Sequence, residues 1–258
     1  MLIATFNCNS VRVRLPIILA WLQRYTPDVL ALQETKCTDD QFPADAFTEA
    51  GWYVVYRGQK TYNGVAMVTY ELPDEASFGL GDDDGESETR LACVRLGDVH
   101  VLNTYVPQGH ELGTDRFRFK LDWFARLRKY VEGRFDAKQS RLVWVGDLNV
   151  AREAIDLYDP EGIRPHVCYC REAGDALESV VSWGFVDVFR KHLPGEGVYT
   201  FWDYRLRGSV SRNLGWRLDH VFATEPMAAA SSECFVDVEP RRLDRPSDHT
   251  FVGARFDI

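Results

Sequence analysis

The sequence predicts an α/β fold, a four-layer α/β sandwich in which two mixed, mainly antiparallel sheets pack face to face with helices outside. A strand, helix, strand unit opens the chain, and segments rich in Val, Tyr and Thr, separated by short turns, follow it. Two strand-rich halves that each carry helical segments indicate two sheets. At 258 residues without an evident linker or repeat, residues 1–258 are expected to form a single domain.

The opening unit alternates between strand and helix. Residues 2–7 (LIATFN) are predicted to form an apolar strand. Residues 10–25 place apolar side chains at helical spacing, and Pro16 is tolerated because it falls in the first turn. Residues 28–35 (DVLALQET) then return as a short strand that carries Glu34 at its C-terminal end.

Antiparallel strands and one long helix follow. The strand candidates are residues 51–58, 63–70, 90–97 and 98–106. Short turns between consecutive strands favour antiparallel pairing, so the sheets should be mixed. The acidic run at 82–88 (DDDGESE) is read as a solvated loop and not as a calcium site. Residues 114–133 predict an amphipathic helix, on which Arg116, Arg118 and Lys120 are read as a solvated face.

The second half of the chain supplies further strands. Residues 141–150 (RLVWVGDLNV) form an unbroken apolar strand that runs into Asp147 and Asn149. A loop-rich stretch leads to a helix at 172–184. The remaining strand candidates are residues 216–224, 233–240 and 249–258.

The composition is that of a soluble globular protein, with 45% hydrophobic and 27% charged residues. No apolar run approaches the roughly 20 residues of a membrane helix, and the first residues lack a signal-peptide pattern. We therefore expect a cytoplasmic protein, nucleoid-associated if prokaryotic, with no membrane partner. Six scattered cysteines are read as reduced structural thiols. A net charge of −9 means that any contacts with nucleic acid must be local.

Polar residues collect at the ends of apolar strands and at the entry to the last one. Asn7, Glu34, Tyr105, Asp147 and Asn149 follow strands, Asp219 and His220 lie within one, and Asp248 and His249 stand at the start of the last. Strand ends are where rigid scaffolds display functional groups. Hard divalent cations take oxygen ligands and are often held by carboxylates together with substrate phosphate. A carboxylate or amide can orient the attacking water, and a histidine held by an acid can add charge or a proton. No GxSxG motif offers a covalent nucleophile, so the pattern predicts metal-assisted hydrolysis of a phosphate ester.

Seven short motifs occur in a recognisable order. They are Phe6-Asn7 with Asn9, LQETK at 32–36, NGVA at 63–66, YVPQG at 105–109, GDLNV at 146–150, GWRLD at 215–219 and SDH at 247–249. Together they resemble the exonuclease III family of AP endonucleases, within the wider endonuclease/exonuclease/phosphatase fold. The resemblance extends from Ile3 to Phe256.

The resemblance implies a role for each matching residue. The implied ligands of Mg²⁺, with Mn²⁺ as a substitute, are Glu34, Asn9 and Asp248. The implied catalytic residues are Asp147, Asn149 and Asn7 around the attacking water, His249 held by Asp219 on the scissile phosphate, and Tyr105 on the phosphate or leaving group. Asp248 and His249 would then be neighbours because the metal and the phosphate meet there.

The substrate is predicted from residues 199–220. Arginines on this loop suit phosphate contact, and the predicted DNA-binding residues are Arg205, Arg207, Arg212, Arg217 and Gln108. The resemblance implies an abasic-sugar pocket formed by Phe201, Trp216 and Leu218. A pocket of that kind excludes an intact nucleotide by size.

The resulting prediction is a monomeric hydrolase that cuts duplex DNA 5′ to abasic sites and removes blocked 3′ ends. The balance between abasic-site incision and 3′ to 5′ exonuclease activity stays open, because Gln108 stands where many animal-type relatives carry Asn. One alternative is a 3′ to 5′ exonuclease or other phosphodiesterase of the same fold with little abasic-site activity. Another is a catalytically silent DNA-binding relative.

Overall fold

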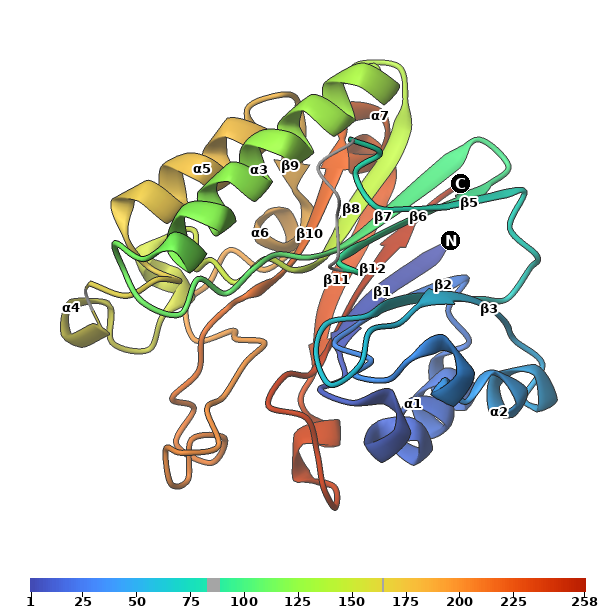
Figure 1. Cartoon of the computed structure of the whole chain (residues 1–258), viewed down its shortest axis with the longest axis horizontal. Coiled ribbons are helices and arrows are strands. Elements are labelled where there is room, and N and C mark those ends of the chain that lie inside the picture. Colours follow the sequence, from blue (N-terminus) through green and yellow to red (C-terminus); the bar gives the residue numbers. More distant parts are fainter. Residues whose placement is uncertain (83–88, 164) are drawn as a thin grey trace.

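The computed structural model describes residues 1–82, 89–163 and 165–258 (Figure 1). Its strands form two mixed sheets, as predicted. Each sheet has six strands. The first sheet has the order β11 (Ser231–Asp237), β12 (Phe251–Phe256), β1 (Leu2–Asn7), β2 (Val29–Gln33), β4 (Val65–Thr69) and β3 (Tyr53–Arg57). The second has the order β5 (Glu75–Phe78), β6 (Leu91–Leu96), β7 (Val99–Tyr105), β8 (Arg141–Asp147), β10 (Asp219–Thr224) and β9 (Phe185–Asp187). Among these strands, only β1 with β2 and β7 with β8 pair in parallel.

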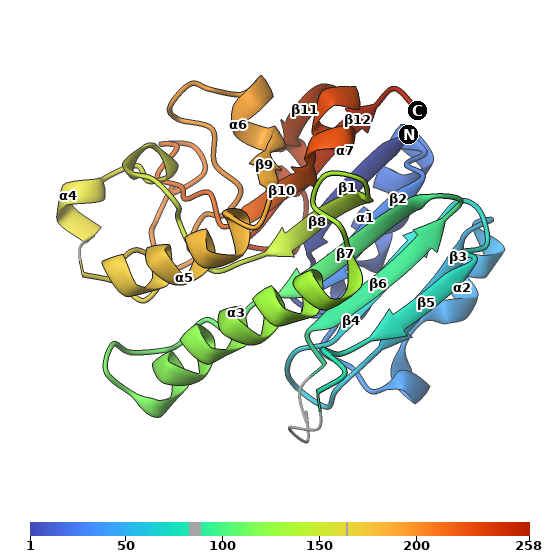
Figure 2. The same ribbon diagram turned by 90° about the horizontal axis from the view of Figure 1, so that it is seen from above.

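Helices cover the outer faces of the two sheets (Figures 1 and 2). Helices α1 (Val11–Tyr25) and α2 (Ala44–Glu49) pack on the first sheet, and α3 (Asp115–Arg134) and α5 (Arg171–Val181) lie side by side on the second. The shorter helices are α4 (Pro160–Ile163), α6 (Val188–His192) and α7 (Glu225–Ala230). Single 3₁₀ turns occur at η1 (Asp39–Gln41), η2 (Ala154–Asp156) and η3 (Glu239–Arg242).

Three apolar layers hold these elements together. Between the sheets, buried side chains such as Met67 meet others such as Val143. Trp21 of α1 packs under the first sheet, and Trp123 of α3 packs under the second. Helix, sheet, sheet and helix therefore stack in four layers, which confirms the predicted architecture.

Some elements differ from expectation. The short strands β5 and β9 were not predicted, because three or four residues are too few to show a periodic pattern. The predicted acidic loop at 82–88 lies outside the described residues except for Asp82, which pairs with Arg126 at 2.6 Å. Across the described residues, no helix is both long and apolar enough to span a membrane.

The sheets are joined by polar contacts near the edge at which β1, β2, β7 and β8 end. Gln33 Nε2 donates to Asn103 Oδ1 at 2.7 Å, and Asn103 Nδ2 donates to the carbonyl oxygens of Leu32 and Ala66 at 3.0 and 3.1 Å. These bonds cross from one sheet to the other. They fix the distance between the two sheets at Gln33, the residue that directly precedes Glu34.

Candidate active site

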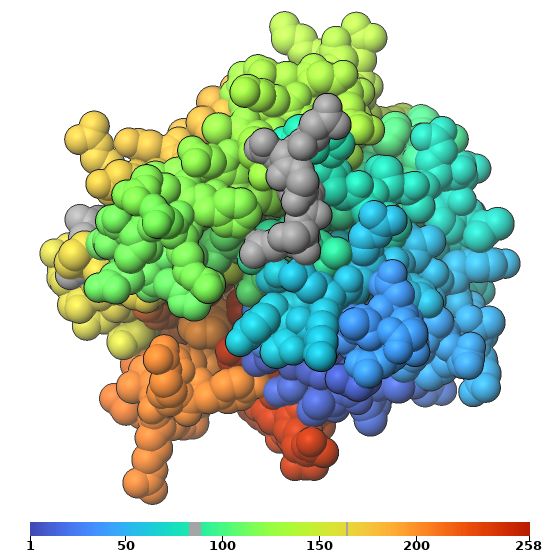
Figure 3. Space-filling view, in the orientation of Figure 1, coloured from blue at the N-terminus to red at the C-terminus, as the bar shows by residue number. Residues whose placement is uncertain are grey.

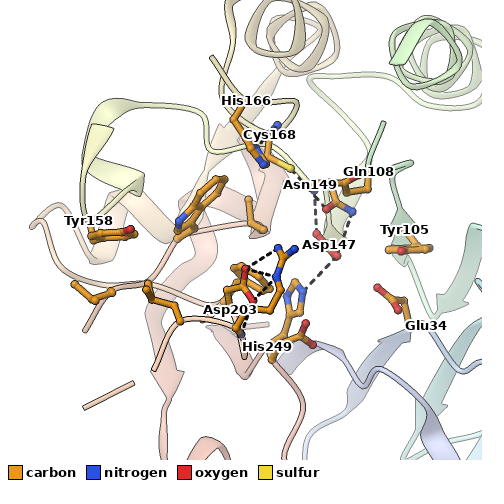
Figure 4. A pocket seen from close by; sticks show the side chains of 17 residues that line it. Glu34, Tyr105, Gln108, Asp147, Asn149, Tyr158, His166, Cys168, Asp203 and His249 are labelled. Atoms are coloured by element: carbon orange, nitrogen blue, oxygen red, sulfur yellow. Dashed lines mark hydrogen bonds and ion pairs between the residues drawn. The ribbon is translucent and has the colours of Figure 1, made fainter. Parts of the chain in front are cut away.

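Asp147 lies at the centre of the site, at the end of β8. Asn7 Nδ2 donates to Asp147 Oδ2 at 2.8 Å and to Glu34 Oε1 at 2.9 Å, so one amide links carboxylates from both sheets. The backbone N–H of Asn149 donates to Asp147 Oδ1 at 2.9 Å. Gly146 is required before Asp147, because a Cβ there would stand 2.0 Å from the carbonyl oxygen of Thr104. The aspartate is thus held from two sides, and Figure 4 shows the contact with Asn149.

His249 faces Asp147 from the segment just before β12, in the first sheet. Its Nδ1 lies 2.8 Å from Asp219 Oδ2, and its Nε2 lies 3.7 Å from Asp147 Oδ2. Burial disfavours the charged imidazolium and by itself would lower the pKa of His249. The nearby carboxylates of Asp219 and Asp147 outweigh burial and raise this pKa to about 10. Burial raises the pKa of Asp147 to about 7, although His249 acts in the opposite direction. A charged imidazolium therefore stands beside a carboxyl that can exchange a proton near neutral pH.

Glu34, Asn9 and Asp248 lie on the side of the first sheet. Asn9 Nδ2 donates to Asp248 Oδ1 at 2.9 Å. The ammonium of Lys36 donates to Asn9 Oδ1 at 2.6 Å and lies 2.5 Å from Glu34 Oε2. Burial raises the pKa of Glu34, but Lys36 and Asn7 outweigh it, so the net pKa is lowered. A cation is already held by these oxygens, and a hard divalent metal uses the same kind of donor.

A second set of donors lies close by. Ligand atoms of Asp147, Asp219 and His249 all lie within 4.8 Å of one another. Asp219 Oδ1 is buried and has no hydrogen-bond partner among residues 1–82, 89–163 and 165–258. An unsatisfied buried acceptor of this kind suits a site that takes a further group. The oxygen-rich site as a whole therefore fits a divalent cation.

Tyr105 ends β7 beside Asp147, with which it is paired in register. Burial, followed by the charges of Glu34 and Asp147, raises the pKa of Tyr105 well above its usual value. The hydroxyl is therefore a proton donor at any pH near neutral. In Figure 4 Tyr105 and Glu34 border the same open space in front of Asp147.

A cavity of about 460 Å³ opens next to these groups. The predicted pocket residues Phe201, Trp216 and Leu218 line it together, and Gln108 lies on its wall. The ring of Phe201 lies 4.9 Å from that of His249, so the apolar wall directly adjoins the polar centre.

Several lining residues were missed by the sequence reasoning. They are Tyr158, His166, Cys168, Leu206 and Leu214. They come from irregular segments without periodic pattern, so no local signal pointed to them. His166 stands edge-on to Trp216 with ring centroids 4.8 Å apart, and its Nδ1 accepts the N–H of Cys168 at 3.1 Å.

Three of the four predicted DNA-binding arginines are exposed. Arg205, Arg207 and Arg212 lie on the segment that projects below the body of the molecule, coloured orange in Figure 3. Arg205 also forms an ion pair with Asp203 at 2.7 Å. This segment borders the cavity, since Asp203, Arg205 and Leu206 line it.

Arg217 was wrongly predicted to contact DNA. Trp216 and Leu218 face the cavity, and because successive side chains of an extended segment point in opposite directions, Arg217 faces the interior. Its guanidinium is fully buried and pairs with Asp156 at 2.8 Å and Asp187 at 2.9 Å. Arg217 therefore supports the pocket wall from behind.

His220 is also buried, but it lies on the same side of its strand as Phe222, on which its ring stacks. It is buried with Nε2 2.8 Å from the carbonyl oxygen of Val150, and burial, together with Arg217, lowers its pKa to about 4. A neutral His220 thus ties the loop after β8 to β10. It belongs to the scaffold of the site and not to its reactive surface.

Replacing Arg217 by Met should lower the free energy of unfolding by about 3–5 kcal/mol, because two buried carboxylates lose a shared partner. Urea unfolding followed by tryptophan fluorescence measures this change. Arg207→Met is the matched control, since an exposed arginine on the same loop should alter stability little. Equal stability of the two variants would contradict the buried-pair interpretation.

Comparison with known proteins agrees with this geometry. A profile described as the Endonuclease/Exonuclease/phosphatase family matches residues 4–249. Exodeoxyribonuclease III of Haemophilus influenzae is 29% identical over 264 aligned positions, covering 98% of each chain. An AP endonuclease from Archaeoglobus fulgidus superposes with a TM-score of 0.97 at 42% identity, covering 100% of both chains. A 3′ phosphatase from Neisseria, solved with a product DNA hairpin, gives 0.95 at 38% identity and the same coverage. Because the matched span contains every side chain placed around Asp147, the chain belongs to the endonuclease/exonuclease/phosphatase family.

Proposed function

We propose that the chain is a divalent-metal-dependent DNA repair nuclease. It hydrolyses the phosphodiester 5′ to abasic sites in duplex DNA and also acts as a 3′ to 5′ exonuclease that repairs blocked 3′ ends. One observation carries the proposal: a buried Asp147 and a charged His249 face each other in a cavity that also has an apolar wall. The names of the relatives, an exodeoxyribonuclease, an AP endonuclease and a 3′ phosphatase, support it.

The residues divide the work of hydrolysis among them. Asp147, oriented by Asn7 and Asn149, accepts a proton from the water that attacks phosphorus. The imidazolium of His249 stabilises the negative charge that develops on the phosphate oxygens. Tyr105 donates its O–H to the same phosphate or to the 3′ oxygen that leaves as the P–O bond breaks.

Mg²⁺ is the proposed cation, with Mn²⁺ as a substitute. Glu34, Asn9 and Asp248 would hold it, and Lys36 would give up its contacts with the first two. A bound divalent cation would supply charge neutralisation at a phosphate oxygen. The side chains then only need to place the water and the phosphate correctly.

Substrate choice follows from the cavity. Phe201, Trp216 and Leu218 offer an apolar surface that suits a deoxyribose without its base, and the rings of Phe201 and Trp216 meet edge to face within it. Arg205, Arg207 and Arg212 are placed to contact the DNA backbone beside the cavity. The proposed partner is duplex DNA with an abasic site or a blocked 3′ end, bound by a monomer.

Cleavage of a fluorescently end-labelled duplex with one tetrahydrofuran abasic analogue tests the proposal directly. Incision at the analogue in Mg²⁺, none in EDTA and little on undamaged duplex are the expected results. Equal degradation of undamaged DNA would favour the exonuclease alternative. Absence of cleavage with every divalent metal would favour a silent DNA-binding relative.

The rate should depend on pH in a bell-shaped manner. Asp147 must be ionised to accept a proton, so kcat should rise as the pH increases through about 7. His249 must be charged, so kcat should fall as the pH passes about 10. Single-turnover rates between pH 5.5 and 10.5 check both limbs, and a rate that is flat between pH 6 and 8 would contradict the assignment of Asp147.

Binding should weaken with salt, but only moderately. Each phosphate neutralised contributes a slope of about −0.9 to log K against log salt, so three exposed arginines predict a slope of about −3. The net charge of −9 gives no broad basic face that would steepen it. Fluorescence anisotropy in EDTA between 50 and 300 mM KCl measures the slope, and an affinity that does not change with salt would refute the arginine contacts.

A further inference from the structure

Lys120 of α3 was predicted to lie on a solvated face, but its side chain is fully buried. Its ammonium donates to the backbone carbonyl oxygens of Gln108 at 3.3 Å, Asn149 at 2.8 Å and Val167 at 2.7 Å. An ammonium has three hydrogens, and all three are used. Within residues 1–82, 89–163 and 165–258, no carboxylate forms an ion pair with it.

The three carbonyl groups belong to three separate loops, and each loop contributes to the cavity. Gln108 and Asn149 line it with their own side chains, and Val167 lies between the lining residues His166 and Cys168. These loops follow β7, β8 and α4, so nothing in the local sequence brings them together. Lys120 contacts all three loops, which are also linked in pairs by Asn149 Nδ2 with the carbonyl oxygen of Val106 at 3.0 Å and by the Ala151 N–H with that of Cys168 at 2.8 Å.

The contact with Asn149 reaches the reaction centre. Asn149 adopts a left-handed backbone conformation with φ of 50°, and its N–H and side-chain amide both donate to Asp147. Lys120 holds the carbonyl of the same residue, so the peptide groups on both sides of Asn149 are fixed. Without the ammonium, this strained residue would be free to relax.

Replacing Lys120 by an apolar residue would remove its hydrogen bonds to the three carbonyl groups. Burial lowers the pKa of Lys120, which shows that the environment disfavours the charge. An apolar side chain of similar length would remove that penalty but would leave three buried carbonyl groups without this donor. The site therefore retains a charged side chain although burial disfavours the charge, as functional sites often do.

We propose that Lys120 is a positioning residue for the hydrolysis proposed above. It holds Asn149 so that Asp147 keeps the orientation needed for water attack, and it holds the 166–169 turn against the cavity. It touches neither DNA nor metal. Its loss should therefore affect turnover far more than binding.

The experiment compares Lys120→Met, Lys120→Arg and the control Lys129→Met, which removes an exposed lysine from the same helix. On the tetrahydrofuran duplex, kcat should fall about 100-fold for Met and about tenfold for Arg, whose planar donors fit three carbonyl groups poorly. Kd for the same duplex in EDTA should change less than about threefold, as for Lys129→Met. Circular dichroism establishes the folded fraction used to scale each rate.

The outcomes separate the two proposals. A wild type that does not cut the analogue argues against abasic-site function, and the same comparison is then made on a duplex with a 3′ phosphate. A folded Met variant with wild-type kcat, or with equal losses in kcat and binding, overturns the role of Lys120. If the Met variant does not fold, the Arg variant decides: slower turnover with faster hydrogen exchange at residues 149–151 and 166–169 supports the role, and unchanged turnover overturns it.

Discussion

Asp147→Asn should lower kcat on the abasic duplex by about 10³-fold, because the amide cannot accept a proton from the attacking water. The change preserves shape, but Asn7 Nδ2 donates to Oδ2 and the Asn149 N–H donates to Oδ1, so only one of these two donors keeps an acceptor in the amide. DNA affinity in EDTA should be equal to or higher than that of the wild type, since a buried negative charge near the phosphate has been removed. A single-turnover assay with quenched-flow sampling separates the chemical step from release.

Stability measurements test whether unfolding explains the lower rate of Asp147→Asn. Because burial raises the pKa of Asp147 above its unfolded value, the ionised form is disfavoured in the folded protein above neutral pH. The neutral Asn avoids this penalty. This gain offsets the hydrogen bond that the amide loses, so the thermal midpoint at pH 8 should change little, whereas a large decrease would mean that the loss of rate reports unfolding.

Asp219→Asn should also cost about 10³-fold in kcat, although Asp219 does not reach the phosphate itself. Asp219 Oδ2 holds His249 Nδ1 and is the strongest of the charges that favour the imidazolium. Without it, the pKa of His249 should fall and the ring should lose both its charge and its fixed orientation at neutral pH. The alkaline limb of the pH profile should move to lower pH.

The displaced limb is the decisive readout for Asp219→Asn, because general loss of structure would not move it. Asp237→Asn is the matched control, since Asp237 is also buried but accepts a hydrogen bond from Trp21 on the far side of the first sheet. That variant should keep both limbs of the wild-type profile. A normal alkaline limb in Asp219→Asn would show that His249 is not charged by its neighbour.

The sequence predicted the elements whose pattern is local. Alternation and apolar runs located ten of the strands, and motifs that end those strands located Asn7, Glu34, Asp147 and His249 at one edge. That success has a simple cause: β1 with β2 and β7 with β8 run parallel, so their carboxyl ends lie at the same edge, and the antiparallel strands β10 and β12 begin at that edge.

The failures share a cause as well. Arg217 and Lys120 are charged, and charge in a loop or on an amphipathic helix usually indicates solvent. Whether such a side chain turns inward depends on partners such as Asp156, or the carbonyl of Val167, that are remote in sequence. Pocket residues such as His166 are likewise placed by tertiary contacts. Only the three-dimensional structure reveals these relations.

The pairing of β1 with β12 has a consequence for the synthesis of the protein. Ser247 Oγ, just before β12, donates to the carbonyl oxygen of Asn7 at the end of β1, so groups separated by 240 residues complete one site. A nascent chain that has not reached residue 247, or a product truncated before it, lacks Asp248 and His249. The proposed hydrolytic site therefore stays incomplete until translation has passed the SDH motif at 247–249.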